Sequence, residues 1–215
     1  MPSTTDTERP EAALAVVGRY LRHERPVTAL VVVLAIAAFL GTLLATSLVP
    51  AVLVAAVLIV AVRAPVLRPE GTVRLHTEKD PEAVLEGFTG PTPPVLAFQW
   101  GLADEVTAGN DVVTYRVSYL FGLRSVELTV RTRVDSTADG DRVELELTTG
   151  DRPRATYSAT IRPDGEGTAV DLEYVSDRRF GLRRLPQRLL AARYRDEALE
   201  VQGYTVVERE ASLRG

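Results

Sequence analysis

Charged and apolar residues are segregated along this chain. Between Arg25 and Arg63 there is no charged residue, and nearly every position is Val, Leu, Ala or Ile. A single helix of that length would reach roughly 54 Å, whereas the hydrocarbon core of a bilayer is about 30 Å thick. The segment 41–50 (GTLLATSLVP) holds the Gly, Thr, Ser and Pro residues expected where a hairpin turns. The pattern predicts a transmembrane helical hairpin over residues 27–67, with helices at about 27–46 and 49–67.

Arginines flank this apolar stretch on both sides. Three of them precede it and two follow it, namely Arg19, Arg22, Arg25, Arg63 and Arg68, while the intervening turn carries no charge. By the positive-inside rule, both ends of such a hairpin face the cytoplasm. The sequence therefore predicts a multi-pass protein of the cell membrane whose soluble domain is cytoplasmic.

The segment ahead of the apolar stretch, residues 1–26, has its own helical pattern. Leu14, Val17 and Leu21 recur at helical spacing between charged residues. An amphipathic helix of this kind can lie on a membrane surface. We therefore expect a cytoplasmic or interfacial segment here, and a simple helical lead-in to the hairpin is the alternative.

The remainder of the chain, residues 70–215, alternates between apolar and polar positions. Such alternation predicts strands with one buried face. It is found in the segments 72–77, 95–100, 112–119, 125–134, 143–147, 155–161 and 169–174. Two connections contain Asp-Gly, at 139–140 and 164–165, and these favour tight hairpins. The strands should therefore form an antiparallel meander.

Two helices are predicted within this part. Asp80 followed by Pro81 is typical of a helix start, and marks a short helix. A longer helix runs from Leu185 to a stop at Gly203, with apolar residues spaced by threes and fours so that one stripe can lie on the sheet. The tail after Gly203 adds a last strand or caps this helix.

The order strand, short helix, strands, long C-terminal helix resembles the helix-grip fold of the START-like superfamily, also called SRPBCC. The segments that carry the resemblance are RLHTEKDPEAVLEGF (74–88) and LPQRLLAARYRDEALEVQGY (185–204), and it covers roughly residues 70–205. The chain departs from the pattern at PTPP (91–94), which leaves little room for a second short helix. The resemblance implies an α+β domain with a cavity for hydrophobic ligands between the curved sheet and the last helix.

Composition excludes several kinds of chemistry. There is no Cys, there are two His, and no phosphate-binding, nucleophile-elbow or zinc-protease motif is present, so we expect no metal and no cofactor. The net charge is −4 and the sequence pI about 5.4, which does not favour nucleic acid as a partner. Arginine supplies all but one of the 25 basic residues, and this skew resembles haloarchaeal or actinobacterial proteins.

The candidate ligand contacts are the aromatic residues on the predicted inward face. Tyrosine hydroxyls beside an apolar cavity can orient a hydrophobic ligand. The alternative is a filled core whose tyrosines reach solvent or the backbone. The candidates are Phe98, Trp100, Tyr115, Tyr119, Tyr157 and Tyr174.

Charged residues give two further hypotheses. Glu144 and Glu146 face outward on one strand, and with Arg131 and Arg133 they are interpreted as a cross-strand ladder rather than a catalytic pair. Arginines near the ends of the hairpin and before the last helix are expected to contact anionic lipid headgroups, with local pairing to acidic side chains as the alternative. They are Arg63, Arg68, Arg178, Arg179, Arg183 and Arg184.

Three functions are compatible with these patterns. The first is a membrane-anchored START-like domain that binds a hydrophobic or lipid-like ligand at the cytoplasmic face without catalysis. The second is an interaction or scaffold module whose cavity is filled by its own side chains. The third is an enzyme of the cyclase or aromatase type, which would need a buried carboxylate or His with a shifted pKa.

Overall fold

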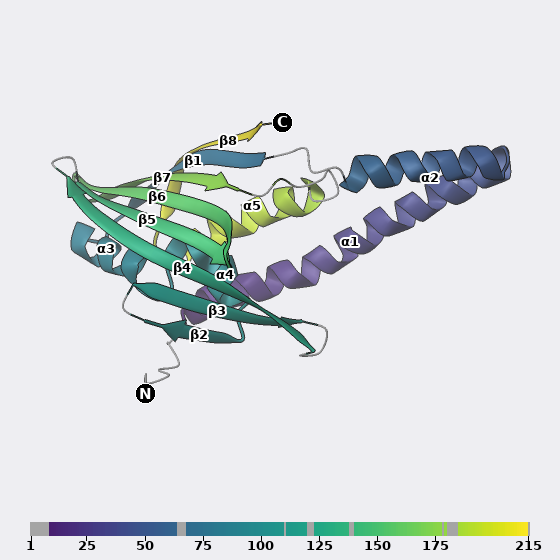
Figure 1. Cartoon of the computed structure of the whole chain (residues 1–215). Coiled ribbons are helices and arrows are strands. Elements are labelled where there is room, and N and C mark those ends of the chain that lie inside the picture. The colour runs from purple at the N-terminus through teal and green to yellow at the C-terminus, as the bar shows by residue number, and fades with distance from the viewer. Residues whose placement is uncertain are drawn as a thin grey trace.

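A single eight-stranded antiparallel sheet organises the chain in the computed structural model (Figure 1). The structure describes residues 9–63, 68–109, 111–119, 123–137, 140–177, 179 and 185–214, with the backbone alone described for 24–28, 31–32, 58, 61–63, 185–190 and 211–214. The strand order is β2-β3-β4-β5-β6-β7-β1-β8. The strands are β1 (Arg68–Thr77), β2 (Glu105–Ala108), β3 (Val112–Tyr119), β4 (Arg124–Thr137), β5 (Gly140–Thr149), β6 (Arg152–Asp164), β7 (Gly167–Ser176) and β8 (Thr205–Arg214).

This architecture confirms the predicted α+β class and the antiparallel meander. Strands β3 to β7 follow one another in sequence and in space, and each pairs with the next in antiparallel register. The tail after Gly203 forms β8, which pairs with β1 and makes one edge of the sheet. The arrangement of sheet and C-terminal helix is consistent with a helix-grip fold.

Helices cover the inner face of the sheet, which we define as the face carrying Val73, Leu145 and Val170. They are α3 (Pro81–Thr89), the short 3-10 helix η1 (Pro94–Leu96), α4 (Ala97–Gly101) and α5 (Leu185–Glu200). Two predicted helix ends are observed. Pro81 is the first residue of α3, and Gly203 after α5 has a φ of +85°, which glycine adopts readily.

The segment 95–100, predicted as a strand, is instead helical. It is divided between η1 and α4, directly after Pro93 and Pro94. Proline fixes φ near the helical value and lacks an N–H, so it favours the first turn of a helix over a position in a ladder. Trp100 and Leu96 are fully buried from this helical segment.

The two N-terminal helices differ from their predicted bounds. Helix α1 (Glu11–Ala45) is one continuous helix that runs through Pro26, and α2 (Leu48–Arg63) returns beside it (Figure 1). We call residues 27–63 of these two helices the arm. Apolar side chains along the arm are exposed, for example Leu34 at 59% and Leu44 at 87%.

The predicted localisation is wrong. Among the described residues, no helix has both the length and the apolar character that crossing a membrane requires. The 16 residues of α2 reach only about 24 Å, less than the roughly 30 Å of a hydrocarbon core. The expected multi-pass protein of the cell membrane with a cytoplasmic domain is therefore not what the structure shows.

The first turns of α1 pack into the core of the sheet domain. Ala13, Val16 and Val17 are at most 1% exposed, and Tyr20 is 9% exposed. Tyr20 packs edge-to-face on Phe98 of α4, with ring centroids 5.0 Å apart, and lies 5.9 Å from the ring of Tyr194 on α5. Of the stripe seen in the sequence, Val17 is buried and Leu14 is partly buried against the core, whereas Leu21 is 36% exposed.

Gly101 sets how closely α1 approaches α4. A Cβ at this position would lie 2.9 Å from the Cγ2 atom of Val17. Valine is stiff at χ1, so its methyl groups do not move aside at low cost. The packing of α1 therefore depends on glycine at this position.

The docking of α1 predicts non-additive effects of two substitutions. Gly101→Ala should lower the free energy of unfolding of the full chain by about 1–3 kcal/mol, because the new methyl group overlaps Val17. In Val17→Ala the same methyl group has room, so the coupling between the two changes should be about 0.5–3 kcal/mol. Chemical denaturation of the single and double variants measures this cycle, and strictly additive costs would contradict the packing of α1 on α4.

Candidate functional site

Two of the predicted cavity tyrosines lie together on the inner face. Tyr157 of β6 and Tyr174 of β7 are directly opposite in register, and their rings stack with centroids 6.2 Å apart and planes at 27°. Both side chains are half-buried. Together they present two hydroxyls and two ring faces on the side of the sheet that α5 covers.

Gly71 on the neighbouring strand β1 makes room for this pair. It lies opposite Tyr174, and a Cβ here would be 2.9 Å from Cε1 of that ring and 2.5 Å from the carbonyl oxygen of Glu210. The ring of Tyr174 therefore leans over β1 toward the edge strand β8. A side chain at position 71 would displace it.

Two other candidates are enclosed in the core. Trp100 and Tyr115 are fully buried, and each directs its polar atom to a backbone carbonyl. Trp100 Nε1 donates to Pro93 at 2.9 Å, and the Tyr115 hydroxyl donates to Pro91 at 2.8 Å. Burial raises the pKa of Tyr115 well above its usual range. Tyr115 of β3 thus anchors the 91–101 segment to the sheet, whereas the Trp100 hydrogen bond lies within that segment.

The last two candidates lie away from the tyrosine pair. Phe98 packs against Tyr20 of α1. Tyr119 is at the end of β3 and is 43% exposed. Of the six residues, Tyr157 and Tyr174 make a direct ring contact, while Trp100 and Tyr115 belong to the core against which Phe98 and Tyr157 pack.

An arginine that the sequence patterns did not single out also faces the inner side. Arg209 of β8 is opposite the buried Val73 in register, and its Nη2 forms an ion pair with Oδ1 of Asp196 on α5. Desolvation by burial raises the pKa of Asp196, although the charge of Arg209 acts in the opposite direction. This pair joins the C-terminal helix to the edge strand.

The arginines expected at a lipid surface differ in their surroundings, and the side chains of four of the six lie outside the described part of the chain. Arg68 donates from Nε to the Ser176 carbonyl at 2.8 Å and pairs through Nη2 with Asp177 at 3.2 Å. Arg179 is exposed. Positions 178, 183 and 184 lie outside the described residues, and Arg63 is described by its backbone alone. Contact of these six arginines with lipid headgroups therefore stays a prediction.

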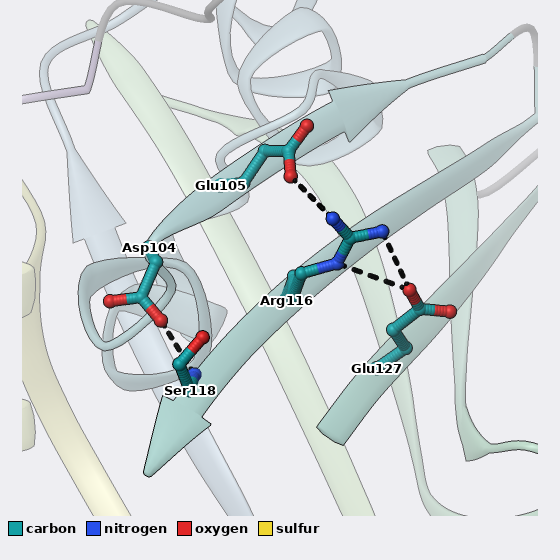
Figure 2. Close-up of polar contacts among 5 residues, drawn as sticks. All are labelled: Asp104, Glu105, Arg116, Ser118 and Glu127. Carbon is teal, nitrogen blue, oxygen red and sulfur yellow. Dashed lines mark hydrogen bonds and ion pairs between the residues drawn. The ribbon is translucent and has the colours of Figure 1, made fainter. Parts of the chain in front are cut away.

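The outer face of the sheet carries cross-strand charge pairs. Arg116 of β3 lies between Glu105 of β2 and Glu127 of β4, as Figure 2 shows. Its Nη1 donates to Glu105 at 3.0 Å, while Nε and Nη2 both donate to Oε1 of Glu127, at 3.2 and 2.9 Å. Hydrogen bonding to Glu127 is the main cause of a raised pKa at Arg116.

The ladder expected between β4 and β5 has the same character. In register, Arg131 is opposite Glu146 and Arg133 is opposite Glu144. Arg133 also lies 3.8 Å from a carboxylate oxygen of Glu146. Each glutamate thus faces an arginine, which supports the interpretation of these residues as a surface ladder.

A groove of about 350 Å³ lies farther along this outer face. It is lined by Thr72, Val73, Arg74, Asp171, Leu172, Glu173, Glu208 and Glu210. Arg74 donates to Asp171 at 2.8 Å, so the cation in the groove is already paired. The groove lies on the opposite side of the sheet from the tyrosine pair. Within the described part of the chain, no group of three or more His, Cys, Asp or Glu side chains is placed to hold a metal ion.

Comparison with known proteins gives structural neighbours and no sequence family. No family model matches the chain, and no curated protein matches it. A STAR-related lipid transfer protein fragment from Xanthomonas axonopodis is 13% identical over 62% of this chain and 83% of its own, with a TM-score of 0.45. A protein from Rhizobium loti is 19% identical over 62% and 96%, and a conserved protein from Geobacillus kaustophilus is 12% identical over 63% and 95%, each with a TM-score of 0.40. These values are too low to transfer a function from any of these proteins.

A pH-dependent contribution to stability is expected at the β2–β3 edge. The backbone N–H of Ser118 donates to Asp104 (Figure 2), and this hydrogen bond lowers the pKa of the carboxyl below 3.8. A carboxyl group whose pKa is lower in the folded state than in the unfolded state stabilises the folded chain at pH values above the unfolded-state pKa. This contribution is lost as the pH falls through the folded-state pKa. Asp104→Asn should therefore lower the melting temperature at neutral pH, and this difference should close by about pH 2.

The matched control is Asp151→Asn, which removes one negative charge from an exposed turn. Melting curves for the three proteins across the acid range test the assignment. A gap between Asp104→Asn and the wild type that is constant with pH would contradict it.

Proposed function

We propose that this chain is a START-like binding protein that takes a hydrophobic or lipid-like ligand on the inner face of its sheet, beneath α5. The observation that carries the proposal is the half-buried Tyr157–Tyr174 pair on that face. Stacked tyrosines offer apolar ring surface together with hydroxyls that can orient a ligand. The proposal includes no membrane anchor.

Burial along the inner face supports this location. Toward α3 the face is closed: Leu75, Val170 and Ile161 are at most 1% exposed, and Val84 and Phe88 of α3 are fully buried. Elsewhere on the inner face, Leu128 of β4 and Val117 of β3 are half-buried, as are the two tyrosines. An apolar ligand would complete the burial of side chains that the protein's own helices leave partly accessible.

The filled-core alternative is favoured by a different observation. Helix α1 adds Val16, Val17 and Tyr20 to the space beside α5, so an extra helix already occupies part of the inner side. Under this alternative the chain is an interaction module that binds no small molecule. An enzymatic role has less support, because Asp196, the carboxylate with a raised pKa, is already paired with Arg209.

A pair of adjacent substitutions distinguishes these functions. Ala155 is a half-buried inner-face neighbour of Tyr157, and Thr156 beside it points to the outer face. In the full chain, Ala155→Trp should fill the ligand space and weaken binding of dodecanol by about tenfold or more. Thr156→Trp should leave the affinity unchanged. Isothermal titration of protein stripped of co-purified molecules measures both, and native mass spectrometry before stripping shows what the protein carries.

The filled-core alternative predicts another outcome. If the inner face is already packed, the wild type binds no dodecanol, and Ala155→Trp overpacks the core at a cost of about 1–3 kcal/mol in the free energy of unfolding. That combination would overturn the proposed function.

A further inference from the structure

Arg209 has a hydrogen-bond donor that the described protein leaves unused. Its Nη2 binds Oδ1 of Asp196, but its Nε is buried and, within the described residues, has no acceptor. A buried N–H without a partner is unfavourable, because it has lost water and gained nothing in exchange. Such a group calls for an oxygen that is not part of the described chain.

Arg116, in the same sheet, is an arginine whose three guanidinium nitrogens all donate hydrogen bonds. There, Nε and Nη2 both donate to Glu127, and Nη1 donates to Glu105 (Figure 2). The Nε–Nη2 side of arginine is a rigid fork whose spacing matches a carboxylate. In Arg209 only one prong of this fork is occupied, by a single oxygen of Asp196.

Arg209 also lies beside the proposed ligand site. Its partner in register on β1 is Val73, and Gly71, two residues along the same face of β1, lies opposite Tyr174. The ring of Tyr174 leans over Gly71, toward the edge where Arg209 lies. One cationic group therefore borders an apolar, aromatic surface, which is the arrangement that a ligand with an apolar chain and one charged end would match.

The charge balance of the pair favours a particular kind of ligand. Arg209 and Asp196 together are neutral, so the site does not compensate a doubly charged group such as a phosphate monoester. A singly charged, planar carboxylate fits both the fork and this balance. Poor solvation at Asp196, reflected in its raised pKa, would strengthen any hydrogen bond made beside it.

We propose that Arg209 binds the carboxylate of a fatty-acid-like ligand through its Nε–H, while the apolar chain of the ligand lies against Tyr157 and Tyr174. This inference rests on the proposed function of the same site. Asp196 holds the guanidinium in place and at the same time competes with the ligand for it. The two acidic groups, one from the protein and one from the ligand, share a single cation.

The test uses dodecanoate and dodecanol, which differ only in their polar end, with the full chain stripped of co-purified molecules. Isothermal titration below the micelle concentration should show that the wild type prefers dodecanoate. Arg209→Gln should weaken dodecanoate binding by about tenfold or more and leave dodecanol binding unchanged. Arg74→Gln, which breaks an ion pair on the outer face of the neighbouring strand, is the matched control and should change neither affinity.

Asp196→Asn gives the sharpest readout. If Asp196 competes with the ligand, removing its charge should tighten dodecanoate binding, so the two partners of one ion pair should shift the affinity in opposite directions. A purely structural pair would shift it in the same direction, or not at all, and that result would overturn the inference. Should Arg209→Gln fail to fold, as judged by circular dichroism, Asp196→Asn decides alone. A wild type that binds neither probe would instead overturn the proposed function itself.

Discussion

The close approach of Val17 to Gly101 is the contact on which the inner side of the molecule depends. It lets α1 lie beside α5, where Arg19 of α1 pairs with Glu197 of α5. The next residue back along α5, Asp196, pairs with Arg209 on the opposite side. Two consecutive acidic residues thus hold the last helix between the first helix and the edge strand, on the side of the sheet where the tyrosine pair lies.

The two faces of the sheet place arginine side chains in different environments. On the outer face, water screens the charges, and pairs such as Arg116 with Glu127 are half-exposed and individually weak. On the inner face, the Nε atom of Arg209 is buried although the side chain as a whole is 27% exposed, so a missing partner at this atom matters more. Ligand binding is therefore expected where a buried donor lacks an acceptor. The outer groove does not meet this condition, because its Arg74 is already paired with Asp171.

Period-two alternation predicted most of the sheet, because one buried face imposes it directly on residues such as Val143, Leu145 and Leu147. It failed at 95–100, where two prolines favoured a helical turn although the pattern alternates. It could not find Arg209 either: a register shift between β1 and β8 near Arg74 leaves Val207 61% exposed, so the tail's own alternation does not show which residues face inward. The helical spacing of α1 was visible, but spacing alone does not say what a helix packs against. Within the site, Tyr157 and Tyr174 were predicted from the sequence. The ion pair between Arg209 of β8 and Asp196 of α5 could not be predicted without knowledge of the fold.

The continuity of α1 has a mechanical consequence. A helix of 35 residues is about 52 Å long, and its buried beginning and exposed end form one rod. Pro26 has no N–H to donate to the carbonyl of Arg22, so the rod is weakest just beyond the last turn that packs on α5. A sideways load on the tip of the arm would bend the helix at this joint before it levered Val17 out of the core. Bending at Pro26 would therefore keep forces on the arm from reaching the packing of α1 against α4 and α5.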